Sequence, residues 1–454
     1  MDSAARFADV SLLADPLYGY IEATKAGPGE ASERLLLNNQ WLQRLRRVHQ
    51  LQSAWWIYPT AEHSRFTHLL GAMHLASQFF KSMDASLRQA FDDTPSPACV
   101  EETLRLAALL HDVGHGPFGH FFDQQYLKQY GIDHEVIGRH LVTGPLADLI
   151  DQMRKSPSGP FAQGEHIDPQ WVAWVMADAD IPGYHPPAWL RACKPVLCGP
   201  ATVDNLDYVP RDAYMCGISL GIVDWRRIVH YSFVQGDSMV LHANAVPALE
   251  MFLTARLYMY TQVYLHRTGR RFDLSMKEIF ADTVRAFLPG NPLDDMDEYL
   301  HLNDWSLLER ASRWQRAAPG SEQRRLGDAW GRIMGRDLPW KLVYETIVNK
   351  GVDLSNLPGR FAAELPAHVR TGSYAVDVAS TRIAPNNPMT DDGMVAIYDP
   401  LQRRIEHSRT AELVARLPQY NQLVRIFSND AAAGDMLRRT ASKLLSDDGA
   451  PPGG

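Results

Sequence analysis

Histidine and aspartate crowd into one short stretch of this 454-residue chain. The string HDVGHGPFGHFFD carries imidazole and carboxylate side chains at His111, Asp112, His115, His120 and Asp123. Five such groups in an apolar frame are costly to bury unless they are paired or bound to metal, and both groups are ligands for divalent ions. We therefore expect a metal site here. For the His-Asp pair by itself, a buried histidine beside a capping aspartate is the alternative.

The position of the pair within its helix matters. Adjacent residues on an α-helix point about 100° apart, so His111 and Asp112 can reach one ion only at a helix end or bend. Gly114 and Gly116 supply that bend.

Helical periodicity dominates the first 290 residues. Apolar residues follow one helical face in 66–80, 101–112 and 248–267. The acidic start of 101–112 suits a helix N-terminus, and its apolar stripe ends at His111. Helices therefore position the candidate site.

The sequence resembles the HD-domain phosphohydrolases, and within them the sterile-α-motif/HD-domain branch of deoxynucleoside triphosphate triphosphohydrolases. The intact string H-D-x-G-H-G-P-F-x-H-x-F-D carries this resemblance. The similarity extends from DPLYGYIE, near residue 15, to about 267, with a weaker similarity to about 430. It implies a mainly α fold: an HD-domain helical core with a small C-terminal α+β lobe.

The resemblance also implies a set of metal ligands. The family pattern of an upstream His, the His-Asp pair and a distant Asp falls on His68, His111, Asp112 and Asp204. Two imidazoles and two carboxylates leave coordination positions open for water and a phosphate oxygen. This ligand set accepts Mn, Mg, Fe, Ni or Zn.

The other histidines divide into two groups. By resemblance, His115 and His134 occupy catalytic positions, and an imidazole can carry protons near neutral pH. We expect His120 and Asp123 to form a supporting or catalytic pair, with a purely structural pair as the alternative. We interpret the remaining histidines of this region as surface or core residues: His49, His63, His74 and His140.

Substrate contacts follow from the same resemblance. Guanidinium groups suit phosphate oxygens, and a solvated helix face is the alternative for the arginines. The matched phosphate positions are Arg65 and Arg256. The positions matched to the deoxyribose and its 3′ side are Gln50, Leu51, Tyr208, Asp212 and Tyr264.

The sequence departs from the family pattern at two positions. Asn205 stands where close relatives carry a lysine or arginine that contacts phosphates. Asn38 replaces an aspartate that reads a guanine edge, and an amide accepts fewer N–H groups than a carboxylate. The other residues matched to the regulatory region are Gln43, Arg46, Arg336 and Lys341. For the last two, a salt-bridged surface helix is the equal alternative.

Pro210 interrupts LDYVPRD. Proline removes a hydrogen bond from a helix interior and clashes one turn back, so we expect a kink near the substrate pocket.

Composition narrows the function classes. The chain is 45% hydrophobic and 22% charged, as in a globular enzyme, and its net charge of −8 argues against general nucleic-acid or acidic-membrane binding. The four cysteines show no zinc-ribbon spacing and indicate reduced, mostly buried thiols. Without a signal peptide or an apolar stretch of about 20 residues, we expect a cytoplasmic protein with no membrane contact.

The chain divides by pattern into four parts. We expect a helical catalytic core over 1–290, with the metal site between 68 and 204, and a helical accessory segment over 291–370. A small α+β lobe over 371–430 contains the β-rich runs MVAIYDP and RRIEHS and a helical TAELVARLPQY. A terminal helix and a frayed tail make up 431–454.

The leading hypothesis is a metal-dependent phosphohydrolase that cleaves a deoxynucleoside triphosphate to deoxynucleoside and inorganic triphosphate. Its partners are the deoxynucleotide, an activator nucleotide and, by resemblance, further copies of the chain in a homo-oligomer. One alternative keeps the metal site and takes a monophosphate, a signalling nucleotide or a nucleic-acid 3′ end. Another is a nucleotide sensor without catalysis.

Overall fold

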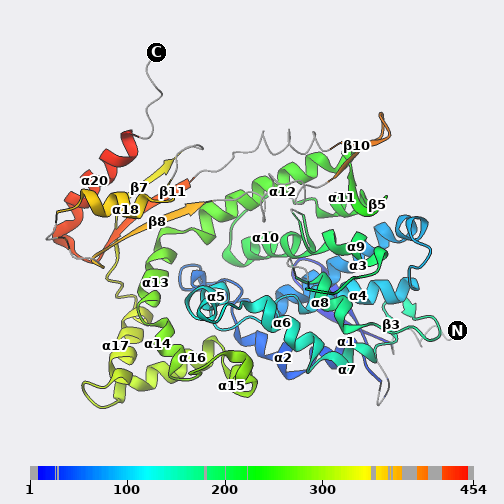
Figure 1. Ribbon diagram of the computed structural model, residues 1–454, viewed down its shortest axis with the longest axis horizontal. Helices are drawn as coiled ribbons and strands as arrows, with labels where there is room; N and C mark the ends of the chain where they lie inside the picture. Colours follow the sequence, from blue (N-terminus) through cyan, green and yellow to red (C-terminus); the bar gives the residue numbers. More distant parts are fainter. Residues whose placement is uncertain are drawn as a thin grey trace. The chain divides into compact units, whose positions relative to one another are not determined.

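The computed structural model describes residues 9–25, 27, 30–177, 181–199, 201–221, 223–348, 354–366, 369, 372–380, 396–406 and 422–447. The chain forms two compact units, each built from three segments (Figure 1). The first unit comprises Met1–Ala255, Val284–Leu307 and Ala384–Leu413. The second comprises Arg256–Thr283, Leu308–Ile383 and Val414–Gly454.

The first unit is organised around helix α3 (Arg65–Ala90), which packs along α4 (Pro97–Leu110) and α10 (Val203–Cys216) (Figure 1). Almost every residue of α3 from Arg65 to Phe80 is buried, so this part of the helix is enclosed on nearly all sides. The Ser96 side chain caps α4, and Pro97 opens it without losing a hydrogen bond. These three helices carry the expected metal ligands.

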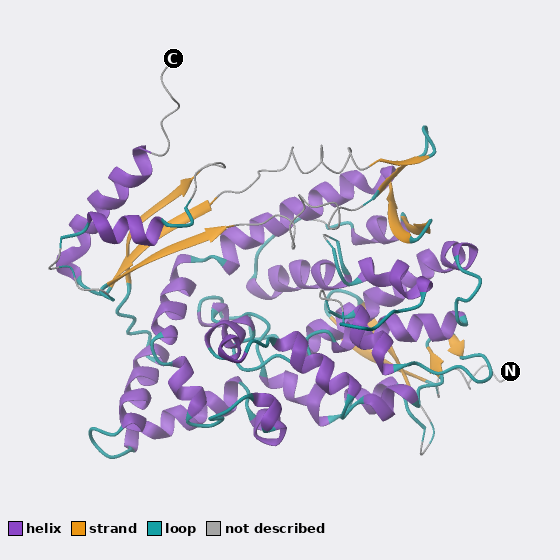
Figure 2. Cartoon of the chain, in the orientation of Figure 1, coloured by secondary structure: helices purple, strands orange, loops and turns teal. Residues whose placement is uncertain are grey.

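Helices predominate among the described residues (Figure 2). The remaining α-helices of the chain are α1 (Glu33–Leu37), α2 (Gln40–Arg44), α5 (His120–Gln125), α6 (His134–Thr143), α7 (Ala147–Asp151), α8 (Pro169–Val175), α9 (Ala188–Cys193), α11 (Trp225–His230), α12 (Val246–Met259), α13 (Arg267–Lys277), α14 (Phe280–Arg285), α15 (Met296–His301), α16 (Asp304–Arg313), α17 (Glu322–Met334), α18 (Leu357–Glu364) and α20 (Gly434–Asp447).

The strands of the first unit form small sheets. β1 (Val10–Asp15) pairs antiparallel with β2 (Gly19–Thr24), and the short strands β3 (Lys155–Ser156) and β4 (Gly159–Pro160) form a second hairpin. A further sheet has the order β10-β9-β6-β5 and is built from β5 (Ser232–Gln235), β6 (Ser238–His242), β9 (Ile397–Asp399) and β10 (Arg404–Glu406).

The second unit contains the small α+β lobe that we expected. Its three strands are antiparallel in the order β7-β11-β8, formed by β7 (Lys341–Val348), β8 (Tyr374–Ser380) and β11 (Gln422–Ser428). Phe361 of α18 and Leu437 of α20 pack against Ile426 of β11 in one apolar cluster. The predicted fold class, a mainly helical core with a C-terminal α+β lobe, is confirmed.

Several boundaries differ from the sequence-based expectations. The helix expected over 101–112 begins at Pro97, so Glu101 and Glu102 lie fully buried within α4 rather than in its first turn. The helix expected over 248–267 is α-helical only to Met259 and continues as a π-helical turn over Tyr260–Tyr264. Amphipathic periodicity detected both helices but not their ends, which capping and tertiary packing set.

The C-terminal strands also group differently. β7 lies within the segment that we expected to be helical, and β9 pairs in parallel with β6 of the first unit, not with the lobe. Strand pairing between distant segments leaves no local pattern in the sequence. The predicted helix TAELVARLPQY and the tail from 448 onward lie outside the described residues.

α10 is helical through Pro210 up to Cys216, so the proline does not end it. The expected kink remains a prediction. None of the described helices combines the length and apolar character that a bilayer crossing needs.

Candidate metal and proton-transfer site

Three helix ends bring His68, His111, Asp112 and Asp204 together. His68 lies in the first turn of α3, His111 is the C-cap of α4, and Asp204 lies in the first turn of α10. The Nε2 atom of His68 is 3.1 Å from Oδ1 of Asp204. The Nε2 atom of His111 is 3.6 Å from Oδ1 of both Asp204 and Asp112. We name these four residues the His-Asp cluster.

Hydrogen bonds at Nδ1 leave Nε2 of both cluster histidines for a metal ion. Nδ1 of His68 lies 2.8 Å from Oδ2 of Asp207, and Nδ1 of His111 lies 2.8 Å from the carbonyl oxygen of Ala108. Because these partners only accept, each Nδ1 donates. Both Nε2 atoms are buried, and among the described residues neither makes a hydrogen bond, although the carboxylate of Asp204 lies near each. Buried polar atoms rarely lack a partner, and a divalent ion would satisfy both at once, so the residues fit a metal.

The charges around His68 also fit a bound metal ion. Burial opposes protonation of this imidazole, but its contacts with Asp204 and Asp207 outweigh that cost and raise its pKa to about 10. The carboxylates therefore favour a positive charge at this position, whether a proton or a metal ion carries it.

A second group adjoins the His-Asp cluster. The rings of His115 and His134 stack with their centroids 3.7 Å apart, and Nδ1 of His134 donates to Oδ2 of Asp123 at 2.7 Å. Nε2 of His115 lies 3.3 Å from Oδ1 of Asp112, which joins the two groups. His120 is 3.4 Å from Asp123, but its side chain is 63% exposed. The donor atoms of this group also lie within 4.8 Å of one another, so proximity alone does not identify the metal site.

The two stacked imidazoles differ in their affinity for a proton. Burial holds the pKa of His115 well below its usual range, and the charges of Arg65 and His134 lower it further. Burial also disfavours a charge on His134, but the hydrogen bond to Asp123 and the charges of Asp123 and Asp112 together outweigh this effect and raise the pKa. A neutral imidazole stacked on one that retains its proton is an arrangement suited to acid-base chemistry.

The glycines of the motif make room for this packing. A Cβ on Gly114 would lie 2.0 Å from the carbonyl oxygen of His134 and 2.5 Å from the backbone nitrogen of Gly138. Gly119 has a φ of +54°, and a Cβ there would lie 2.4 Å from the guanidinium of Arg65. Direct backbone contact between the loop and α6 is therefore what brings His134 onto His115.

Arg65, a predicted phosphate contact, lies beside the His-Asp cluster. Its Nη1 atom is 2.5 Å from Oδ2 of Asp112, and the side chain is buried. Burial raises the pKa of Asp112, but Arg65, His111 and His115 together outweigh that effect and hold the pKa well below its usual range. The structure thus places Arg65 where it can serve both the cluster and an anionic ligand.

Of the predicted sugar contacts of the first unit, Tyr208 lies beside the His-Asp cluster. The ring of Tyr208 faces His68 edge-on at 6.4 Å, and Leu51 is buried. The side-chain oxygen of Gln50 is buried without a hydrogen-bond partner among the described residues. Asp212 is held by Nε2 of His63 at 2.8 Å, so His63 supports a predicted binding residue. The sequence predicts only a surface or core position for His63 and does not predict this contact.

The side chain of Asn205 makes its hydrogen bonds to residues just before the start of α10. Its side-chain amide donates to Oγ1 of Thr202 at 2.8 Å and to the carbonyl oxygen of Gly199 at 3.2 Å. Asn205 is therefore a buried, uncharged part of the start of α10.

Arg256 and Tyr264 belong to the second unit. Arg256 lies near the end of α12 with its guanidinium 5.6 Å from the ring centroid of Tyr260, and Tyr264 ends the π-helical turn. π-helical turns are frequent at functional sites. The roles of both residues in substrate binding remain predictions.

The residues matched to the regulatory region lie in both units. Asn38 is the C-cap of α1, Gln43 donates to the carbonyl oxygen of Leu37, and Arg46 lies 3.8 Å over the ring of Phe66. In the second unit, Arg336 has a φ of +61° and Lys341 begins β7. Nucleotide binding by these residues remains a prediction.

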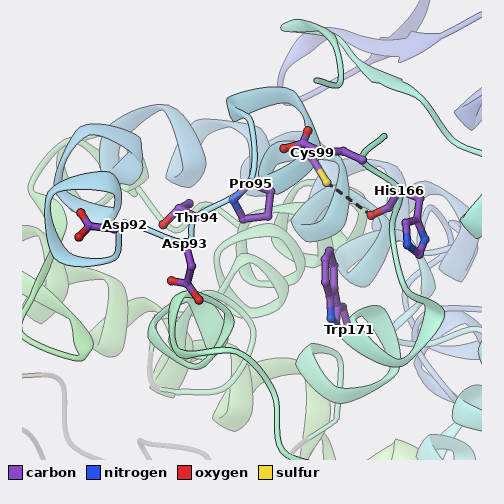
Figure 3. Close-up of a pocket in the computed structure, with 8 residues that line it drawn as sticks. Asp92, Asp93, Thr94, Pro95, Cys99, His166 and Trp171 are labelled. Carbon is purple, nitrogen blue, oxygen red and sulfur yellow. Dashed lines mark hydrogen bonds between the residues drawn. The ribbon is translucent and has the colours of Figure 1, made fainter. Parts of the chain in front are cut away.

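Two cavities of the first unit lie elsewhere. One, of about 330 Å³, is lined by Asp92, Asp93, Thr94, Pro95, Cys99, Glu165, His166 and Trp171 (Figure 3). The other, of about 460 Å³, is lined by Leu17, Tyr18, Pro210, Ala213, Tyr214, Ile218, Ser219, Leu220, Gly221, Val223 and Trp225. No predicted site residue lines either cavity.

Asp207 is the functional residue that the sequence analysis missed. It orients His68 and pairs with Arg211 at 2.8 Å. Its spacing of three from Asp204 places both carboxylates on one face of α10, which is the signal that could have found it.

Two parts of the chain match models of known protein families. A model of the HD domain matches residues 65–170, and a model of the HD associated region matches residues 223–341. The chain is 31% identical over 244 residues to the uncharacterized protein YwfO of Bacillus subtilis, covering 54% of this chain and 50% of that protein. It is 24% identical over 426 residues to the deoxynucleoside triphosphate triphosphohydrolase SAMHD1 homolog of Dictyostelium discoideum, covering 92% of this chain and 78% of the relative. The chain spans about half the length of the first two curated relatives that it matches.

Solved structures share the fold. A hypothetical protein from Aquifex aeolicus superposes with a TM-score of 0.69 at 22% identity, over 95% of this chain and 100% of that one. A phosphohydrolase from Bacteroides thetaiotaomicron gives a TM-score of 0.68 at 20% identity, over 92% of this chain and 99% of that one.

Proposed function

We propose that this chain, which matches models of the HD domain and the HD associated region, is a metal-dependent phosphohydrolase of the HD-domain superfamily that hydrolyses deoxynucleoside triphosphates to deoxynucleoside and inorganic triphosphate. One observation carries the proposal: the His-Asp cluster directs two buried Nε2 atoms, which make no hydrogen bond among the described residues, toward two carboxylates and lies in contact with the stacked pair of His115 and His134.

The residues of the chain divide the chemistry between them. His68, His111, Asp112 and Asp204 would hold the divalent ion. A bound divalent ion lowers the pKa of a water molecule and neutralises charge on phosphate oxygens.

Proton transfer falls to the stacked pair. His134, whose proton is stabilised by Asp123, donates to the leaving oxygen, and the neutral His115 beside it orients the attacking water. Arg65 binds phosphate oxygens through the part of its guanidinium that Asp112 does not use. Gln50 supplies a buried amide for the 3′ side of the sugar.

Two observations support a triphosphate substrate. The Dictyostelium relative is named a deoxynucleoside triphosphate triphosphohydrolase, and Arg65 lies at the site. The test is a panel of nucleotides incubated with Mn²⁺ or Mg²⁺, with and without an added activator nucleotide. We expect inorganic triphosphate and deoxynucleoside as products. Metal-loaded protein that releases triphosphate from none of the nucleotides overturns the proposal.

Two matched variants test whether the activity depends on the His-Asp cluster. Asp112→Asn removes a ligand charge while it preserves the side-chain volume, and we expect at least a hundredfold loss of turnover. His140→Asn, at an exposed histidine of α6, is the control and should retain full activity.

A second candidate keeps the metal site but takes a monophosphate or a signalling nucleotide. The observation that favours it is Asn205, whose amide is used within α10 and adds no cation to the site. Release of orthophosphate from a monophosphate, with no triphosphate from the panel, decides for this candidate.

Regulation and assembly are part of the proposal by resemblance. We expect a homo-oligomer whose assembly responds to an activator nucleotide bound by Gln43 and Arg46. Size-exclusion chromatography with and without nucleotide tests this expectation.

A further inference from the structure

The loop between Gly114 and Phe118 is held from outside its own segment. The hydroxyl of Tyr299, on α15, donates to the carbonyl oxygen of Gly114 at 2.6 Å. The carboxylate of Asp304, at the start of α16, accepts from the backbone nitrogen of Phe118 at 2.8 Å. Two residues about 185 positions away in sequence therefore bind both ends of the loop that carries His115.

Arg44 completes this arrangement. Its Nη1 atom donates to the carbonyl oxygen of His115 at 2.6 Å, and its Nε atom donates to the carbonyl oxygen of Leu302 at 3.2 Å. The guanidinium also lies 4.5 Å over the ring of Tyr299. We name Arg44, Tyr299 and Asp304 the loop clamp.

Asp304 ties the loop to a second part of the site. Its other oxygen accepts from the backbone nitrogen of His49 at 2.9 Å and from Nδ1 of the same residue at 2.8 Å. His49 directly precedes Gln50, a predicted substrate contact. One carboxylate thus fixes together the loop that carries His115 and the start of the segment that carries Gln50.

The loop clamp buries polar and charged groups and holds a strained backbone, and both features cost free energy of folding. Arg44, Tyr299 and Asp304 are almost completely buried, and burying a charge costs several kcal/mol unless partners compensate. Phe118 has a φ of +62°, which is unfavourable for a residue with a bulky side chain. A strained residue persists only where its surroundings determine its conformation, and the bond from Asp304 to its N–H does so.

We propose that the loop clamp is a set of positioning residues that fixes His115 against Asp112 and His134 and couples this loop to the segment beginning at His49. The clamp acts through the backbone of the loop and not on substrate. Its catalytic consequence rests on the proposed hydrolase function, whereas its effect on the loop does not.

The first test measures the loop without using activity. Tyr299→Phe removes one hydroxyl and keeps the ring, and Asp304→Asn removes the charge and keeps the volume. We expect amide hydrogen exchange in peptides covering 112–119 to accelerate at least tenfold in both variants, while peptides from α3 stay unchanged. Loop exchange like that of the unmodified protein overturns the proposal.

A matched control separates positioning from stability. Tyr126→Phe removes another buried hydroxyl that donates to backbone carbonyls, those of Leu288 and Gly290. We expect it to lower the melting temperature about as much as Tyr299→Phe does and to leave exchange in 112–119 unchanged. Equal acceleration of loop exchange in this control would show that the loop reports general stability, which also overturns the proposal.

The second test uses turnover of whichever nucleotide proves to be the substrate. We expect Tyr299→Phe to lower kcat about tenfold with KM within twofold, and Asp304→Asn to lower kcat and raise KM because it also releases His49. Tyr126→Phe should change neither constant. If the unmodified protein turns over no nucleotide, the proposed function fails while the exchange experiment still decides for or against the clamp.

Discussion

At the scale of the residue, Asp207 lies outside the motif and yet orients His68, a predicted metal ligand. It accepts from Nδ1 of His68 and binds Arg211 through both oxygens, and Arg211 also pairs with Asp15 at 2.8 Å. Such partners fix the tautomer and the direction of a ligating imidazole, and their loss typically lowers metal affinity 10–100-fold.

We expect Asp207→Asn to weaken Mn²⁺ binding by roughly tenfold to a hundredfold, measured by isothermal titration calorimetry. Asp15→Asn is the matched control because it removes the other carboxylate partner of Arg211 without touching His68. The control should keep its affinity within about twofold. Equal losses in both variants would show that the Arg211 network, not the bond to His68, is responsible.

We expect the free energy of unfolding to depend on pH through the lowered pKa of His74. Burial lowers its pKa to about 4, with the charges of Arg105 and Lys81 adding to the effect, whereas Asp15 and Asp207 oppose it. Because the folded state binds this proton less readily than the unfolded state, stability falls as the pH drops from about 6.5 towards 4.

We expect His74→Phe, which keeps a ring against Tyr18, to remove this loss. At pH 5 the difference from the unmodified protein should reach about 2 kcal/mol relative to pH 7, measured by urea unfolding. His140→Asn, an exposed histidine, should unfold with the same pH dependence as the unmodified protein. A His74→Phe curve parallel to that of the unmodified protein would contradict the assignment.

At the scale of the element, the site depends on where helices end. α4 ends at Leu110, two residues before Asp112, and His111 caps it, so the adjacent pair can turn toward one point. α6 begins at His134, and its backbone packs directly on Gly114. The motif predicted the helix end at His111, but contact between α6 and the loop depends on packing that periodicity does not encode.

Gly114→Ala tests the contact between the loop and α6. The added Cβ would overlap the carbonyl oxygen of His134, so α6 must shift and the stack of His134 on His115 must open. We expect a loss of about 1–3 kcal/mol in unfolding free energy and a loss of activity of a hundredfold or more. Gly434→Ala is the control because its Cβ finds only ordinary contact with Val343, 3.7 Å away. A fully active Gly114→Ala variant would contradict this account.

At the scale of the whole molecule, each unit assembles from three separated segments. The His-Asp cluster, the stacked pair and the loop clamp all belong to the first unit, which includes Val284–Leu307 from a distant part of the chain. Ligand binding to one unit stabilises its folded state by mass action.

We expect Mn²⁺ at about 100 times its dissociation constant to stabilise the metal-binding unit by about 2.7 kcal/mol. The melting temperature should rise by several degrees in differential scanning fluorimetry, and His111→Ala should abolish the rise. A shift of the same size in His111→Ala would place the ion elsewhere.

The sequence by itself determined the class of fold and indicated the chemistry of the site. Periodicity detected the helices, and the intact motif with its family resemblance pointed to His68, His111, Asp112 and Asp204, of which His68 and Asp204 lie far from the pair in sequence. Asp207 could have been found only from its spacing of three from Asp204. Arg44, Tyr299 and Asp304 left no signal, because an isolated charged or aromatic residue is common on any helix.

Only the tertiary structure decided what orients and supports the site. It paired Asp207 with His68, placed Asp304 between Phe118 and His49, and engaged Asn205 within its own helix. Hydrogen bonds between segments nearly two hundred residues apart depend on how the helices pack, whereas local sequence patterns record only which face of each helix is apolar.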